Sequence, residues 1–351
     1  GVWIMAYTPI DKSSDYFNTI LWTGNGGSQT ISGYGFQPDF LWTKVRDAAD
    51  SHQLRDAVRT INKPVRSNST VAEYTVTSAG AFNADGFTTV GNDGDEFNGN
   101  SKSYVSWGWK ANGSGASNED GTINTTKTSA NTTSGFSIST YTGTGSAATF
   151  GHGLGVAPDA VIVKNLGAAE DWNVWIRSQT PKIGLLNDGA VFYSPGAAGI
   201  NGPTITSSVI GLGTSATANG SSATYVAYCF TSIKGFSKFG SYVGNGNADG
   251  PFIFTGMKPA FTLIKRAAGG TESWYINDNK RLGYNPNHYY LLPNDAAAEG
   301  SSATLKINLL SNGFKIRNTD TSYNTSGSTY VYLSFAENPF VTSTGIPTLA
   351  S

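Results

Sequence analysis

The sequence has little of several features that would assign it to a familiar class. A single cysteine, Cys229, excludes an internal disulfide framework. Charged residues make up 13% of the chain and the formal net charge is −1, whereas about a quarter of the residues are charged in typical soluble proteins. Such a charge balance provides no general attraction to nucleic acid or to an anionic membrane surface. We therefore expect neither as a partner.

Long apolar runs and catalytic signatures are also missing. No apolar stretch approaches the roughly 18–20 residues that span a bilayer, so membrane insertion is not expected. No serine lies in a G-x-S-x-G pattern, and the sequence specifies no convergent set of acid, base and nucleophile. We expect a protein that is not an enzyme and holds no cofactor, apart from the calcium site considered below.

Glycine and aromatic residues are abundant, and they form a repeated strand signal. The 43 glycines and 12% aromatic residues suit an all-β protein with many tight turns. Three six-residue segments, 104–109, 225–230 and 330–335, each begin with Tyr-Val and keep large apolar side chains on alternate positions. This alternation is typical of a half-buried strand. The residues that define it are Tyr104, Trp107, Trp109, Tyr225, Tyr228, Phe230, Tyr330 and Phe335.

Two further signals precede each Tyr-Val strand in the same order. The first is an aromatic residue near a glycine turn, at 22–26, 141–145 and 242–246, which predicts a hairpin of fixed register. The second is an apolar strand led by a proline, which is tolerated at a strand start because it lacks an N–H. A lysine follows six residues after each proline. The prolines are Pro38, Pro158 and Pro259, and the lysines are Lys44, Lys164 and Lys265.

The constant spacing of these signals predicts three copies of an antiparallel β-unit of about 100 residues, too long a period for a solenoid. Tandem domains and a single pseudo-threefold body both fit this pattern. The segment 51–59 replaces the aromatic strand of the other copies and predicts a short helical turn or a polar strand. We expect an N-terminal arm at 1–16, repeats at 17–110, 136–231 and 235–337, a linker rich in Gly, Ser, Asn and Thr at 111–135, and a tail at 338–351.

The densest cluster of oxygen ligands lies in the segment 92–98. Asp93, Asp95 and Asn98 surround a glycine and could coordinate Ca²⁺ through several oxygens. The spacing does not complete an EF-hand, and solvated acidic turns have the same composition. Both interpretations stay open.

Aromatic side chains outside the repeated strands are candidates for a ligand-binding surface. Trp and Tyr anchor interfaces, but those at repeated strand positions are expected to fill the core. The candidates outside the strands are Tyr284, His288, Tyr289 and Tyr290.

The segments 22–26, 36–44 and 104–110 together resemble a family of repeat-bearing virion proteins encoded by marine tailed bacteriophages. The resemblance covers nearly the whole chain, because 141–164 and 225–230 follow the same pattern. It implies three tandem β-sandwich repeats of jelly-roll or lectin-like type, in a tail fibre, appendage or capsid decoration at the virion surface. Implied partners are other virion proteins, further copies in a trimer, and host glycans. No catalytic residue is implied.

The leading hypothesis is therefore a non-enzymatic virion structural protein. An alternative is a free carbohydrate-binding module or adhesin, based on the aromatic and Asn-rich loops. A third, a glycan depolymerase, needs paired carboxylates in one cleft.

Overall fold

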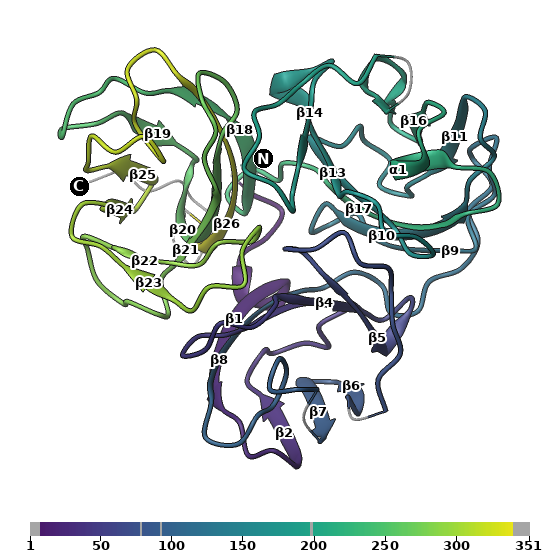
Figure 1. The fold of residues 1–351 in the computed structure, drawn as a ribbon, viewed down its shortest axis with the longest axis horizontal. Helices are drawn as coiled ribbons and strands as arrows, with labels where there is room; N and C mark the ends of the chain where they lie inside the picture. The colour runs from purple at the N-terminus through teal and green to yellow at the C-terminus, as the bar shows by residue number, and fades with distance from the viewer. Residues whose placement is uncertain (1–7, 78, 92, 197–198, 340–351) are drawn as a thin grey trace, which may run out of the picture.

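The computed structural model shows an all-β protein, as expected. It describes residues 8–339 except 78, 92 and 197–198. Antiparallel sheets form three lobes around a common centre (Figure 1). Within these described ranges no helix is long and apolar enough to cross a membrane. The helical segments are one α-helix, α1 (Ala216–Asn219), and the 3-10 helices η1 (Ser13–Asp15), η2 (Arg177–Gln179) and η3 (Gly202–Thr204).

Lobe 1 comprises β1 to β8 and lies at the bottom of Figure 1. Its larger sheet has, in spatial order, β1 (Phe17–Thr23), β8 (Ser103–Trp109), β3 (Phe40–Val45), β4 (Gln53–Asp56) and β5 (Thr60–Arg66). Its smaller sheet has β2 (Ser28–Ser32), β7 (Gly86–Val90) and β6 (Ala81–Asn83).

Lobe 2 comprises β9 to β17. Its larger sheet has, in spatial order, β14 (Ile183–Leu185), β13 (Asn173–Ile176), β12 (Ala160–Asn165), β17 (Thr224–Phe230), β10 (Phe136–Thr142) and β9 (Lys127–Asn131). Its smaller sheet has β11 (Ala148–Gly151), β16 (Val209–Leu212) and β15 (Ile200–Asn201).

Lobe 3 comprises β18 to β26. Its larger sheet has, in spatial order, β18 (Ser237–Val243), β26 (Thr329–Pro339), β20 (Met257–Arg266) and β21 (Trp274–Asp278). Its smaller sheet has β19 (Phe252–Phe254), β25 (Gly313–Ile316) and β24 (Ile307–Leu310), and a separate pair joins β22 (Tyr289–Tyr290) to β23 (Gly300–Ser301).

The three larger sheets share one strand order. In each, the Tyr-Val strand (β8, β17 or β26) lies between the strand that enters the glycine turn and the proline-led strand. A further strand, β4, β13 or β21, pairs with the proline-led strand on its other side. The polar segment 51–59 therefore contains a strand, β4, at the place of the two aromatic strands, and all four residues of β4 are buried.

Two details of the sequence interpretation need correction. The segment 111–135 is not simply a linker, because β9 lies within it and pairs with β10 at the edge of the lobe 2 sheet. Ile123 in the same segment is buried and bridges to Phe150. A segment with few apolar side chains can still join a sheet through its backbone N–H and C=O groups. Pro259 also differs from the prediction, since it lies inside β20 at a β-bulge rather than before the strand.

Each Tyr-Val strand begins with a tyrosine that fixes the preceding polar loop. The Tyr104 hydroxyl donates to the Asp95 carbonyl and accepts from the Gly99 N–H. A Cβ on Gly24 would lie 2.3 Å from the Gly99 carbonyl oxygen, so this close approach requires glycine at the turn. Tyr225 and Tyr330 make the equivalent contacts, with Ala216 and Gly220 and with Thr321 and Thr325.

The Tyr-Val strands also connect each lobe to a core shared by all three. In β17, Tyr225 lies in the core of its own lobe, whereas Tyr228 and Phe230 belong to the shared core. Alternate side chains of a strand leave opposite faces of the sheet, so one strand contributes to both cores. The ring centroids of Phe230 and Phe335 are 5.8 Å apart, and those of Trp109 and Phe335 are 5.4 Å apart. These contacts join the lobes directly.

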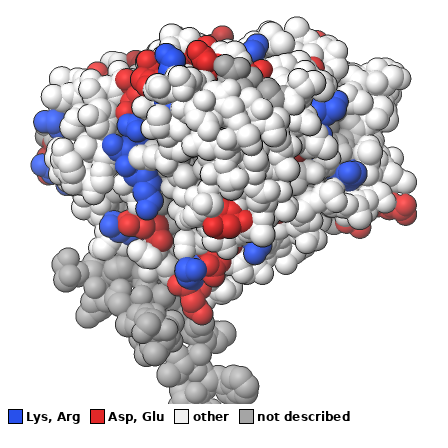
Figure 2. Space-filling model, turned by 90° about the horizontal axis from the view of Figure 1, so that it is seen from below, with Lys and Arg blue, Asp and Glu red and all other residues white. Residues whose placement is uncertain are grey.

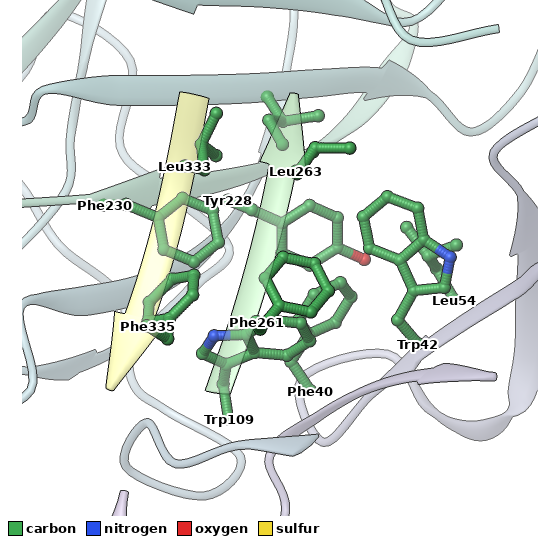
Figure 3. A pocket seen from close by; sticks show the side chains of 11 residues that line it. Phe40, Trp42, Leu54, Trp109, Tyr228, Phe230, Phe261, Leu263, Leu333 and Phe335 are labelled. Carbon is green, nitrogen blue, oxygen red and sulfur yellow. The ribbon is translucent and has the colours of Figure 1, made fainter. Parts of the chain in front are cut away.

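The shared core surrounds a small apolar cavity of about 20 Å³ (Figure 3). Phe40 of lobe 1 and Tyr228 of lobe 2, with centroids 4.4 Å apart, line it together with Phe261 and Phe335 of lobe 3. Close-packed protein interiors hold few voids larger than a water molecule, and this cavity is of that small size. The aromatic residues of the repeated strands therefore serve packing, as the sequence predicted.

Candidate functional site

The lobes are joined by three equivalent backbone hydrogen bonds. In each, the acceptor carbonyl lies two residues after the lysine of a proline-led strand. The donor lies in the preceding lobe, with lobe 3 preceding lobe 1, so the bonds run around a closed ring. The bonds are Glu73 N–H to Leu166 O (3.0 Å), Phe192 N–H to Ala267 O (3.0 Å) and Glu299 N–H to Arg46 O (2.7 Å). We call these contacts joint 1–2, joint 2–3 and joint 3–1.

The lysines of the proline-led strands lie at the joints and are fully buried. Lys164 Nζ donates to the Thr70 carbonyl of lobe 1 at 2.9 Å, and Lys265 Nζ donates to the Gly189 carbonyl of lobe 2 at 2.8 Å. Lys44 Nζ donates to the Val45 carbonyl at 2.7 Å. Burial lowers the pKa of each of the three lysines to about 8.

Joint 1–2 contains a buried charge network. The Asp56 carboxylate of lobe 1 accepts from Arg59 Nε at 2.7 Å and from the Tyr228 hydroxyl of lobe 2 at 2.8 Å. Arg59 also pairs with Glu73 at 2.9 Å. Burial alone would lower the pKa of Arg59, but Asp56, Tyr228 and Glu73 outweigh it and hold that pKa above its ordinary value. The arginine therefore stays charged.

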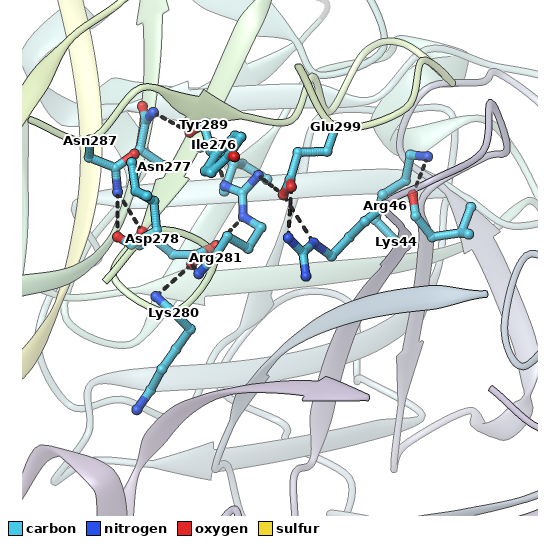
Figure 4. Close-up of polar contacts among 12 residues, drawn as sticks. Lys44, Arg46, Ile276, Asn277, Asp278, Lys280, Arg281, Asn287, Tyr289 and Glu299 are labelled. Carbon is cyan, nitrogen blue, oxygen red and sulfur yellow. Dashed lines mark hydrogen bonds and ion pairs between the residues drawn. The ribbon is translucent and has the colours of Figure 1, made fainter. Parts of the chain in front are cut away.

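Joint 3–1 repeats this network with residues from the other end of the chain (Figure 4). The Asp278 carboxylate accepts from Arg281 Nε at 2.6 Å and from Trp107 Nε1 of lobe 1 at 3.1 Å. Glu299 pairs with Arg281 at 3.1 Å and with Arg46 of lobe 1 at 2.7 Å. The two aspartates have the same register, since each lies opposite the residue two places after the proline.

Joint 2–3 has an apolar set at these positions. Ile176 takes the place of the aspartate and Phe192 that of the glutamate. Phe192 lies against Trp274 of lobe 3 with centroids 6.1 Å apart. Leu333 replaces the tyrosine or tryptophan of the facing strand and belongs, with Ile176, to the shared core. At this joint, therefore, the side chains of both lobes differ from those of the other two joints, and both sets are apolar.

The predicted binding aromatics lie in one short segment, which ends in β22, but they do not form one surface. Tyr284 is 68% exposed, whereas His288, Tyr289 and Tyr290 are half-buried. The Tyr290 ring packs on Tyr275 of the lobe 3 core at 5.4 Å. His288 contacts the Pro286 carbonyl through Nδ1 at 3.2 Å. Tyr284 is the most exposed of the four.

The calcium candidates have separate structural partners. Asp93 accepts from Arg55 at 3.0 Å, which balances its charge. The Asn98 amide donates to the Gly27 carbonyl and the Thr89 hydroxyl, and the Asp95 carbonyl accepts from Tyr104. The described part of the chain contains no group of three or more His, Cys, Asp or Glu that could hold a metal ion.

The joint residues were not predicted from the sequence, although a signal for them is present. Asp56 and Arg59 are three residues apart, and so are Asp278 and Arg281, and each aspartate is the last residue of an equivalent strand. His52 was also missed: it stands where the other lobes have Trp172 and Trp274, and it accepts from Trp42 Nε1 at 3.0 Å. Burial, with Lys44 and Arg281 nearby, holds its pKa well below the ordinary value.

These features define a class of protein: an all-β body in which three sheet-built lobes close a ring around one apolar core. The chain belongs to the family described as a domain of unknown function (DUF7483), whose model matches residues 12–339. That match spans all three lobes. A comparison with curated proteins found no match.

Proposed function

We propose that this chain is a structural protein of a tailed-bacteriophage particle, exposed in a tail fibre, another appendage or a capsid decoration, and that it is not an enzyme. It would consist of three copies of one lectin-like β-sandwich unit, at 17–110, 136–231 and 235–337. The observation that carries this proposal is the set of three equivalent backbone bonds that close the ring. The resemblance of the repeated segments to virion proteins provides the biological context.

The closed ring supports a structural role because it makes one chain into a rigid threefold-like body. Homotrimers reach such a shape by associating three separate chains. Here the shared core and the three joints hold the lobes together within one polypeptide. The trimer implied by the resemblance is therefore unnecessary for a threefold-like shape, and light scattering of the purified protein distinguishes one chain from three.

The exposed surface also suits a protein that lies on the outside of a particle, in contact with solvent. The face drawn in Figure 2 is mostly uncharged, with basic and acidic side chains interspersed. Labelling of purified virions with antibodies against this chain, viewed by electron microscopy, tests the location. We expect label at the particle surface, and virions that lack the protein would contradict the proposal.

A carbohydrate-binding module or adhesin is the second candidate. The exposed ring of Tyr284, beside a hollow lined by asparagines, favours it. A depolymerase would shorten host polysaccharide during incubation, and unchanged polysaccharide would exclude that activity.

A further inference from the structure

Three adjoining hollows form a groove along lobe 3 where it meets lobe 1. Their volumes are about 210, 90 and 360 Å³. Asn279 and Glu337 line both the first and the second hollow, and Asn285 lines both the second and the third. The shared residues make the hollows direct neighbours on one surface. We call them together the amide groove.

Asparagine is the side chain that recurs along the amide groove. A carboxamide both donates and accepts hydrogen bonds, as a sugar hydroxyl does. In the middle hollow Lys258 pairs with Glu337 at 2.8 Å, whereas Lys280 in the first hollow and Lys306 in the third add positive charge. The middle hollow therefore suits an uncharged polar ligand. The asparagines are Asn18 and Asn338 in the first hollow, Asn279 in the first and second, Asn287 in the second, Asn285 in the second and third, and Asn308 in the third.

Several groove residues carry a buried oxygen that has no hydrogen-bond partner among the described residues. Asn287 is 1% exposed, and its Nδ2 donates to the Asp278 carbonyl at 2.7 Å while its Oδ1 accepts nothing. An unsatisfied buried acceptor costs about 1–3 kcal/mol. These oxygens are themselves closed to solvent, so a ligand would reach them only through a shift of the side chains around them. The other such oxygens are Thr19 Oγ1, Asn279 Oδ1 and Asn308 Oδ1.

Tyr284 lies on the middle hollow and provides the apolar element of the groove. Its ring is the most exposed of the large hydrophobic side chains in the described chain, at 68%. Aromatic rings bury large apolar areas and keep a polar edge, which matches the apolar face and hydroxylated rim of a pyranose ring. A ring beside several amides in a groove is thus complementary to a saccharide.

The geometry points to a neutral oligosaccharide as the ligand of the amide groove, with one sugar ring against Tyr284 and hydroxyls donating to the groove amides. This assignment gives the ligand class of the surface-exposed protein proposed above and rests on that proposal for the source of the glycan. Binding is a property of the purified chain, however, so it can fail or succeed independently of where the protein lies on a virion.

The test is an array of neutral and acidic oligosaccharides probed with the purified full chain, followed by calorimetry on the strongest ligand. We expect a neutral oligosaccharide to bind. We expect Tyr284→Ala to weaken it about tenfold or more, which is the loss of about 1.4 kcal/mol of binding. Asn308→Ala should also weaken it, because this residue contributes to the third hollow.

The matched control is Tyr193→Ala, which removes a tyrosine ring that is 42% exposed on lobe 2, away from the groove. It should leave the affinity unchanged. Three results would overturn the inference: no neutral ligand on the array, binding restricted to acidic glycans, or an equal loss of affinity for Tyr193→Ala and Tyr284→Ala. Circular dichroism of each variant confirms that it is folded, since both tyrosines are exposed.

Discussion

Joints 1–2 and 3–1 are ionic where joint 2–3 is apolar, yet all three have the same backbone hydrogen bond and the same buried lysine. At joint 2–3 the changes occur as a set: Ile176, Phe192 and Leu333 replace an acid, an acid and a polar aromatic residue. The backbone hydrogen bond is thus common to all three joints, and two different side-chain sets fill the same space.

The difference teaches that a buried charge network is stable only as a whole. The free-energy cost of desolvating two charges is offset only when every partner is present. A well-packed apolar set of similar size is often equally stable or more stable. Removing one partner leaves an uncompensated buried charge. A mixed joint, in which Asp278 faces a leucine at the place of Trp107, would be the least stable arrangement.

The largest expected effect comes from breaking an ionic joint. Asp278→Asn leaves the buried Arg281 without its closest carboxylate and should lower the free energy of unfolding by about 3–5 kcal/mol. Ile176→Val at the equivalent place of the apolar joint should cost only about 0.5–1.5 kcal/mol. Urea unfolding measures both, and equal losses would contradict the distinction between the joints.

Converting joint 3–1 into the apolar type should reverse that loss. The five substitutions Arg46→Ala, Trp107→Leu, Asp278→Ile, Arg281→Gln and Glu299→Phe replace the ionic set by the residues of joint 2–3, in which Gln179 lies three residues after Ile176. His52 stays at the place of Trp274. We expect the unfolding free energy to be unchanged or raised by about 1–4 kcal/mol. Asp278→Ile alone, the partial graft, should be strongly destabilising. A full graft as unstable as the single variant would show that the two sets are not interchangeable.

The shared lysines should make stability rise with pH. Their pKa is lowered to about 8 in the folded protein, whereas a lysine in the unfolded chain titrates near about 10.4. Between these values the unfolded chain binds more protons, so the free energy of unfolding increases with pH. Each lysine contributes up to about 1.4 kcal/mol per pH unit. Unfolding at pH 8 and 9.5 should show this rise, and Lys164→Met should reduce its slope.

The smallest expected effect is at the margin of joint 1–2. Lys63 pairs with Glu73 at 2.8 Å, but its side chain is 44% exposed. Exposed ion pairs contribute about 0–1 kcal/mol, so Lys63→Ala should hardly change the urea midpoint. A loss comparable to that of Asp278→Asn would mean that the outer pair belongs to the buried network.

The sequence predicted the strands well because their signals are local. Alternating aromatic residues marked β8, β17 and β26, and the turn glycines marked the ends of β1, β10 and β18. The strand β4 was left ambiguous because its polar residues are buried by partners that lie far along the chain, such as Asp93 for Arg55. The composition of 111–135 predicted a linker, because composition does not show that the backbone of β9 pairs with β10.

The joints could not be predicted from any single segment. Asp56 and Tyr228 are buried together, but their relation emerges only when equivalent positions of all three copies are compared. Of the candidate site residues, the sequence located Tyr284 from its place outside the repeated strands. It could not show that Tyr290 packs against the core of lobe 3, because that depends on Tyr275 in another strand.

The closed ring has a consequence for how such a protein can change in size. A solenoid lengthens by adding copies, because each copy contacts only its neighbours along one direction. Here the last lobe contacts the first, and each lobe supplies one sector of a single core. A fourth copy would find no open end to join, and loss of one copy would expose the inner faces of the other two. The number three is therefore a property of how the lobes pack around one core, and insertions should accumulate in the outward loops.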